Sequence, residues 1–133
     1  MTKKASKRHK TLLLIDDENV WLDTMKTVLK EESFEIFTAD SGTEALSKLK
    51  KIKPDLILSD VKMPDMNGFE LYDKIKHNPK LSDIPFVFMS SLDDYDAKKV
   101  AKTLGAVDYI EKPFDVEQVK TIVLGLLQKY QNK

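Results

Sequence analysis

The chain has 133 residues, of which 41% are hydrophobic and 33% charged, so it fits one soluble globular domain and leaves no room for a second full one. It contains no cysteine, which excludes disulfides and thiolate metal sites and suits a reducing compartment. No run approaches the ~18 consecutive apolar residues of a membrane span, and the start of the chain lacks an apolar signal-peptide core, so we expect a cytoplasmic protein without a membrane segment.

Charge is distributed unevenly along the chain. The 22 basic and 22 acidic residues cancel, but residues 1–10 hold five basic residues and no acid. The rest has 17 basic against 22 acidic residues, which argues against direct nucleic-acid binding by the folded part. We expect a basic flexible tail at 1–10, with contact to an anionic partner as the alternative, a domain at 11–130, and a C-terminal end or the start of a linker at 131–133.

Five short apolar runs of β-forming residues alternate with five longer segments of helical spacing. The predicted strands cover residues 11–15, 34–39, 55–59, 85–89 and 106–110. Several of these runs are continuously apolar, as in strands that are covered on both faces. The alternation predicts an α/β fold with a doubly wound, five-stranded parallel sheet and helices on both of its faces.

The helical segments carry start and stop signals. An apolar stripe covers residues 21–29 in the first predicted helix. Ser41 and Glu44 have the spacing of a capping box, which predicts the start of the second helix. Gly105 is a predicted C-terminal stop for the fourth helix, and apolar residues recur over 116–127 in the last one.

Acidic and polar residues follow the predicted strands at one edge of the sheet. Asp16 and Asp17 follow the first strand, Asp60 the third, Ser90 the fourth and Lys112 the fifth. In an open α/β sheet, ligands bind outside these carboxyl ends. Carboxylates packed closely repel one another unless a cation lies between them, and oxygen ligands without histidine or cysteine indicate Mg²⁺.

A lysine and a hydroxyl beside such a metal are typical partners for phosphate oxygens. The four glycines are too scattered for a glycine-rich phosphate loop, so a tightly cradled nucleotide is not expected. A carboxylate nucleophile that forms an acyl phosphate is the simplest remaining chemistry.

Four motifs give the chain a family resemblance. They are LLIDD at 13–17, LSDVKMPDMNG at 58–68, MSS at 89–91 and YIEKPF at 109–114. In this order they resemble the receiver domain of two-component response regulators. The resemblance implies a flavodoxin-like (βα)5 fold with strand order 2-1-3-4-5.

The resemblance also implies roles for individual residues. Asp60 would be the phosphoacceptor, which takes a phosphoryl group from a histidine kinase or a phosphotransfer protein. Magnesium would be held by Asp17, Asp60 and the main-chain carbonyl of Lys62, with Asp16 supporting the metal through water. The protein would then be a signalling switch that catalyses only its own phosphorylation and dephosphorylation.

Further implied roles concern transmission of the signal. Ser90 stands at the hydroxyl switch position, Lys112 at the phosphate-binding lysine and Tyr109 at the aromatic switch, and the Lys112–Pro113 peptide bond should be cis. Phosphorylation would change a protein-interaction surface for an effector that the sequence does not identify. The resemblance also allows a homodimer that forms on phosphorylation.

Two other functions fit these residues less well. A magnesium-dependent phosphohydrolase of the haloacid dehalogenase type would need a second aspartate two residues after the nucleophile, where this chain has Lys62. A degenerate receiver that acts only as a binding surface is disfavoured by the intact acidic set and Lys112.

Overall fold

A computed structural model describes residues 10–30, 34–91, 95–112 and 116–131, which form alternating strands and helices. The strands are β1 (Thr11–Ile15), β2 (Glu35–Ala39), β3 (Leu56–Asp60), β4 (Phe86–Ser91) and β5 (Asp108–Lys112). The helices are α2 (Asn19–Lys30), α3 (Gly42–Lys48), α4 (Gly68–Lys76), α5 (Tyr95–Leu104) and α6 (Val116–Gln131). Residues 1–9 of the tail predicted at 1–10, and Pro113 with its predicted cis bond, lie outside the described residues. In the described part of the chain, no helix combines the length and apolarity needed to cross a bilayer.

The strands form one parallel sheet in the order β2-β1-β3-β4-β5, which confirms the predicted strand order. Because all five strands run in the same direction, their carboxyl ends lie at one edge of the sheet. The register pairs Ile15 with Ser59 and Asp60 with Met89. The residues that follow β1 therefore lie beside the last residue of β3.

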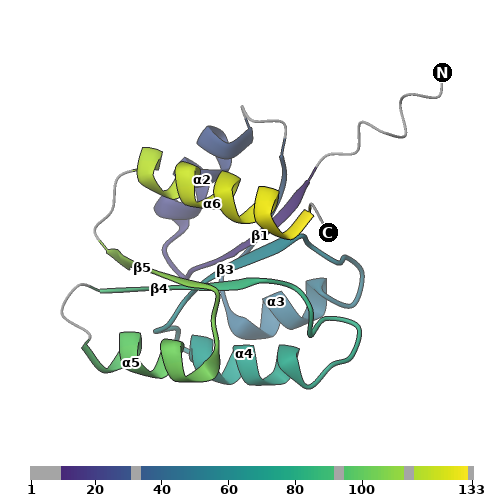
Figure 1. Cartoon of the computed structure of the whole chain (residues 1–133), viewed down its shortest axis with the longest axis vertical. Coiled ribbons are helices and arrows are strands. Elements are labelled where there is room, and N and C mark those ends of the chain that lie inside the picture. The colour runs from purple at the N-terminus through teal and green to yellow at the C-terminus, as the bar shows by residue number, and fades with distance from the viewer. Residues whose placement is uncertain (1–9, 31–33, 92–94, 113–115, 132–133) are drawn as a thin grey trace.

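Helices cover both faces of the sheet, with α2 and α6 on one face and α3, α4 and α5 on the other (Figure 1). Side chains alternate between these faces along each strand. In β1, Leu12 and Leu14 pack with the core under α2 and α6, whereas Leu13 and Ile15 pack with the core under the other three helices. All four side chains are fully buried, which explains why the strand is apolar at each of these four positions.

An aromatic cluster joins the sheet to α4 and α5. The ring of Tyr72 on α4 meets Phe86 at 5.1 Å between centroids and Phe88 at 5.4 Å. The Tyr72 hydroxyl donates a hydrogen bond to the carbonyl oxygen of Leu104 at 2.9 Å, at the last residue of α5. Tyr72 thus connects the carboxyl end of α5 to α4 and to the core.

The last strand begins two residues later than predicted, at Asp108 instead of residue 106. Gly105 ends α5 with a φ of 91°, and its N–H donates to the Lys102 carbonyl while the Ala106 N–H donates to the Ala101 carbonyl. This pair of bonds is a Schellman motif, as the glycine predicted, and it takes up Ala106 in the turn. The apolar residue after Gly105 therefore belongs to the helix end and not to the strand.

The start of α3 forms one of the two hydrogen bonds of the predicted capping box. The Ser41 hydroxyl accepts a hydrogen bond from the Glu44 N–H at 3.1 Å. The Glu44 carboxylate instead accepts from the N–H of Asp40, one residue before the cap, at 2.6 Å. Both interactions satisfy backbone donors at the entry to the helix.

Candidate metal centre

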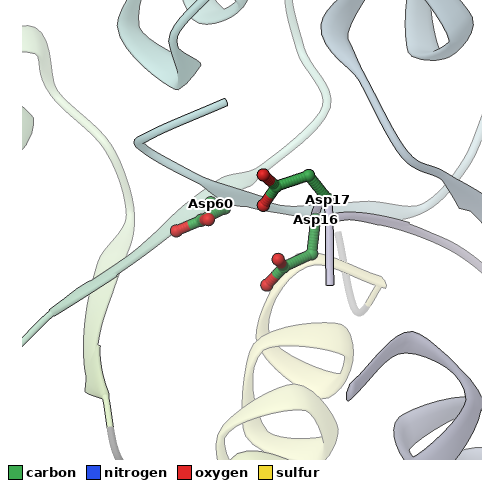
Figure 2. A group of neighbouring side chains, drawn as sticks. All are labelled: Asp16, Asp17 and Asp60. Atoms are coloured by element: carbon green, nitrogen blue, oxygen red, sulfur yellow. The ribbon is translucent and has the colours of Figure 1, made fainter. Parts of the chain in front are cut away.

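Three carboxylates meet at the carboxyl edge of the sheet, as the sequence predicted. Asp16 and Asp17 follow β1, and Asp60 is the last residue of β3, which lies next to β1. One oxygen from each carboxylate lies within 4.8 Å of the other two (Figure 2). The sheet register therefore brings together residues that are 43 or more positions apart in the sequence.

The three aspartates differ in burial and in what fixes them. Asp16 is fully buried and Asp60 is 7% exposed, whereas Asp17 is exposed. Oδ1 of Asp16 accepts a hydrogen bond from the Glu18 N–H at 3.0 Å, and Oδ1 of Asp60 accepts from the Val61 N–H at 3.0 Å. Backbone donors thus orient the two buried carboxylates, while Asp17 faces solvent.

The donor set fits magnesium. The group holds carboxylate oxygens and no histidine or cysteine, which matches the preference of a hard divalent cation. Negative charge concentrated within a few ångströms also favours a cation electrostatically. Asp16, Asp17 and Asp60 could therefore hold the ion. The family resemblance implies the backbone carbonyl of Lys62 as a further ligand.

Close backbone packing fixes the position of Asp60. A Cβ placed on Gly68, the first residue of α4, would lie only 2.4 Å from the Asp60 carbonyl oxygen and 3.1 Å from the Val61 Cα. The Ser59 hydroxyl donates to the same Asp60 carbonyl at 3.0 Å. Glycine at position 68 lets α4 begin directly against the end of β3, a role that sequence reasoning did not assign to it.

Ser90 and Lys112 follow at the next two strands. Ser90 is 2% exposed and lies one residue beyond Met89, the β4 partner of Asp60. Lys112 pairs with Ser91 at the end of β5, so its backbone reaches the same edge. The side chain of Lys112 lies outside the described part of the structure.

Tyr109 lies on β5. Its side chain is on the face of the sheet that α3, α4 and α5 cover. It pairs with Phe88 on β4, and its half-buried ring packs against the core of that face. Its hydroxyl oxygen is buried. The aromatic side chain assigned to the switch therefore lies turned inward in this structure.

Asp65 belongs to the second sequence motif, which gave it no individual role, and it links the loop after β3 to the start of α3. Its carboxylate accepts hydrogen bonds from the N–H groups of Gly42 at 3.2 Å and Thr43 at 2.8 Å, and from the Thr43 hydroxyl at 2.5 Å. The Thr43 hydroxyl and these backbone N–H groups lower the pKa of Asp65 to about 2. No local pattern predicts a bond between residues 22 positions apart, although an acidic residue near a helix start is a general signal for a cap.

Comparison with known proteins identifies the family. A family model described as the response regulator receiver domain matches residues 12–124, so the chain belongs to this family. The chain is 36% identical over 111 residues to the transcriptional regulatory protein CrdR of Helicobacter pylori, an alignment that covers 84% of this chain and 52% of that protein. The chain spans about half the length of the curated relatives it matches.

Solved structures agree with this assignment. The chemotaxis response regulator CheY4 of Vibrio cholerae superposes with a TM-score of 0.81 at 28% identity, over 88% of this chain and 98% of that one. The signal receiver domain of a signal transduction histidine kinase from Syntrophus aciditrophicus gives a TM-score of 0.85 at 30% identity, over 93% and 94% of the two chains. The protein is a receiver domain of two-component signalling, a family whose members bind Mg²⁺ at an acidic pocket and interact with histidine kinases and effectors.

Proposed function

We propose that Asp60 is the residue that accepts the phosphoryl group. The observation that supports this assignment is the convergence of Asp16, Asp17 and Asp60 within 4.8 Å at the carboxyl edge of the sheet. Of the three, Asp60 lies nearest to the end of β4, where its strand neighbour Met89 precedes Ser90. The Ser90 hydroxyl would therefore lie on the β4 side of the Asp60 carboxylate, and Asp16 and Asp17 on the β1 side.

The reaction is a phosphoryl transfer to a carboxylate. A carboxylate oxygen of Asp60 forms a bond to phosphorus while the bond from phosphorus to the nitrogen of a donor phosphohistidine breaks, which leaves an acyl phosphate and a neutral imidazole after proton uptake. The Val61 N–H holds Oδ1 of Asp60 during the attack. Ser90 and Lys112 are proposed to contact the phosphoryl oxygens. Water later attacks phosphorus, the bond from phosphorus to the Asp60 oxygen breaks, and inorganic phosphate and the free carboxylate are released.

Magnesium belongs to this proposal as the cofactor. Asp17, Asp60 and the Lys62 carbonyl would hold it directly, and Asp16 would support it through water. When bound, it neutralises charge shared by the carboxylates and the incoming phosphoryl group. The Glu18 N–H orients the Asp16 carboxylate. Because Asp16 is buried, it adds negative charge to the site without being exposed to the phosphoryl donor.

The experiment that tests the acceptor function is chemical phosphorylation of the full chain. The protein is incubated with magnesium and either acetyl phosphate or phosphoramidate, and its intact mass is then measured. We expect one phosphoryl adduct that requires magnesium and decays with time. Turnover of many phosphomonoesters without an adduct would instead favour a phosphohydrolase.

Asp17→Ala should remove magnesium binding and stabilise the metal-free protein. The substitution deletes an exposed ligand and relieves repulsion that amounts to about 1 kcal/mol for charges this close in a water-like medium. We expect a melting temperature roughly 4 °C above that of wild type without magnesium, and no further rise when magnesium is added. Melting curves with and without the ion measure both effects. An undiminished magnesium-induced shift would show that Asp17 is not a ligand.

The proposed output is a change in the surface formed by α5, β5 and α6. Phosphorylation adds negative charge and acceptor oxygens at Asp60, which Ser90 can engage from the end of β4. This contact would stabilise Tyr109 in the inward position that it already has in this structure, one strand further along the sheet. The partners are a histidine kinase or phosphotransfer protein upstream and an effector protein or second copy of this chain downstream.

Ser90→Ala should still accept phosphate at Asp60 but transmit the signal poorly. The hydroxyl is the group that couples the acyl phosphate to β4, and alanine cannot replace its hydrogen bond. Amide shifts or amide exchange are compared across residues 90–130 with and without a beryllofluoride mimic. The hydroxyl has no coupling role if the variant responds there as fully as wild type does.

A further inference from the structure

The loop between β3 and α4, residues 61–67, is closed at its base by backbone hydrogen bonds. The Gly68 N–H donates to the Val61 carbonyl at 2.7 Å, and the Val61 N–H donates to the Met89 carbonyl at 2.9 Å. The first residue of the loop and the first residue of α4 are therefore fixed together and to β4. Residues 62–67 form an arc between these two fixed points.

The far side of the arc is fastened to a different part of the chain. The carboxylate of Asp65 receives three hydrogen bonds, from the Gly42 N–H, the Thr43 N–H and the Thr43 hydroxyl, at the start of α3. Met66 packs against the same point, since a Cβ on Gly42 would lie 2.3 Å from the Met66 Cγ. Lys62 lies between the base of the arc and this attachment.

We propose that Asp65 is a positioning residue for the metal: by fastening the arc to the start of α3, it keeps the Lys62 carbonyl at the edge where the carboxylates converge. The inference rests on the proposed function, which gives the Lys62 carbonyl to the magnesium ion. Asp65 itself lies three residues further along the loop and is not one of the three clustered carboxylates.

The physical reason is preorganisation. With the attachment in place, residues 62–64 are held between two fixed points before an ion arrives. Without it, the arc is held only at its base, and binding must then restrict additional backbone freedom. Fixing one residue costs the equivalent of roughly a tenfold change in an equilibrium constant, so losing the attachment should raise the Kd for magnesium by about tenfold.

The test is a magnesium titration of the full chain. Binding is monitored through the amide shifts of Lys62 and Met63 and, separately, by calorimetry. We expect Asp65→Ala to raise the Kd by about tenfold. Phosphorylation by phosphoramidate should be slower at low magnesium and return close to the wild-type rate at saturating magnesium. Asp65→Asn keeps one acceptor oxygen and should recover part of the affinity. Amide exchange at Gly42 and Thr43 should accelerate in Asp65→Ala without magnesium.

Ser41→Ala is the matched control, because it removes the cap of α3 and leaves the Asp65 carboxylate in place. If it weakens magnesium binding as much as Asp65→Ala does, general loosening of α3 explains the effect and the inference is wrong. The inference is equally wrong if Asp65→Ala binds magnesium with wild-type affinity. If the wild-type chain itself binds no magnesium, the proposed metal site fails and the inference fails with it, a result that is distinct from the first two.

Discussion

Asp60→Asn is expected to abolish the phosphoryl adduct. An amide oxygen is a far weaker nucleophile than a carboxylate oxygen, and the substitution also weakens a metal ligand. The fold should survive, because the asparagine oxygen can still accept the hydrogen bond from the Val61 N–H and one of three repelling charges is removed. Intact mass after incubation with magnesium and phosphoramidate measures the loss directly.

Asp55→Asn provides the control for this experiment. Asp55 precedes the opposite end of β3 and accepts a hydrogen bond from the Thr11 N–H at 2.8 Å, so the same chemical change is made far from the carboxylate cluster. This variant should be labelled like wild type. Labelling of Asp60→Asn under the same conditions would mean that another residue accepts the phosphoryl group.

Gly68→Ala is expected to have the largest effect on stability. The added methyl would lie 2.4 Å from the Asp60 carbonyl oxygen, and backbone atoms cannot rotate away as a side chain can. Overpacking of this kind costs about 3 kcal/mol, which lowers the melting temperature of a domain of this size by roughly 10 °C. Because α4 must move away from the end of β3, phosphorylation of Asp60 should slow as well.

Two other glycines separate this effect from the general cost of replacing glycine. At Gly42 the new methyl meets the side chain of Met66, which can change rotamer, so we expect a smaller loss. At Gly125, inside α6, nothing lies within 4 Å, and alanine should stabilise the helix by up to about 1 kcal/mol. Melting curves should therefore give the lowest melting temperature for Gly68→Ala, a higher one for Gly42→Ala and the highest for Gly125→Ala. Equal losses in all three variants would contradict the packing argument.

The sheet and the carboxylate cluster were predictable from sequence because their causes are local or follow from topology. Apolar runs such as Leu12 to Ile15 indicate a strand buried on both faces, and parallel strands necessarily end at the same edge. Given the strand order that the family resemblance implies, Asp16, Asp17 and Asp60 were therefore expected to meet, as they do in the structure. The same reasoning placed Ser90 beside them, one strand further along.

Other features depend on tertiary contacts that no local pattern contains. The bonds of Asp65 to Gly42 and Thr43 arise only when the loop after β3 lies against the start of α3. Similarly, the need for glycine at position 68 follows from how closely α4 approaches β3. The inward position of Tyr109 depends on packing between β5 and the helices, which hydrophobic periodicity does not resolve.

The hydrogen bond from Tyr72 to Leu104 has a mechanical consequence for α5. It fastens this helix at its carboxyl end, next to the turn at Gly105, whereas the amino end follows the β4 strand that carries Ser90. A helix that is fixed at one end can move only by rotating about that end. If the end of β4 shifts, we therefore expect α5 to move most in its first turn and least at Leu104, beside Tyr72.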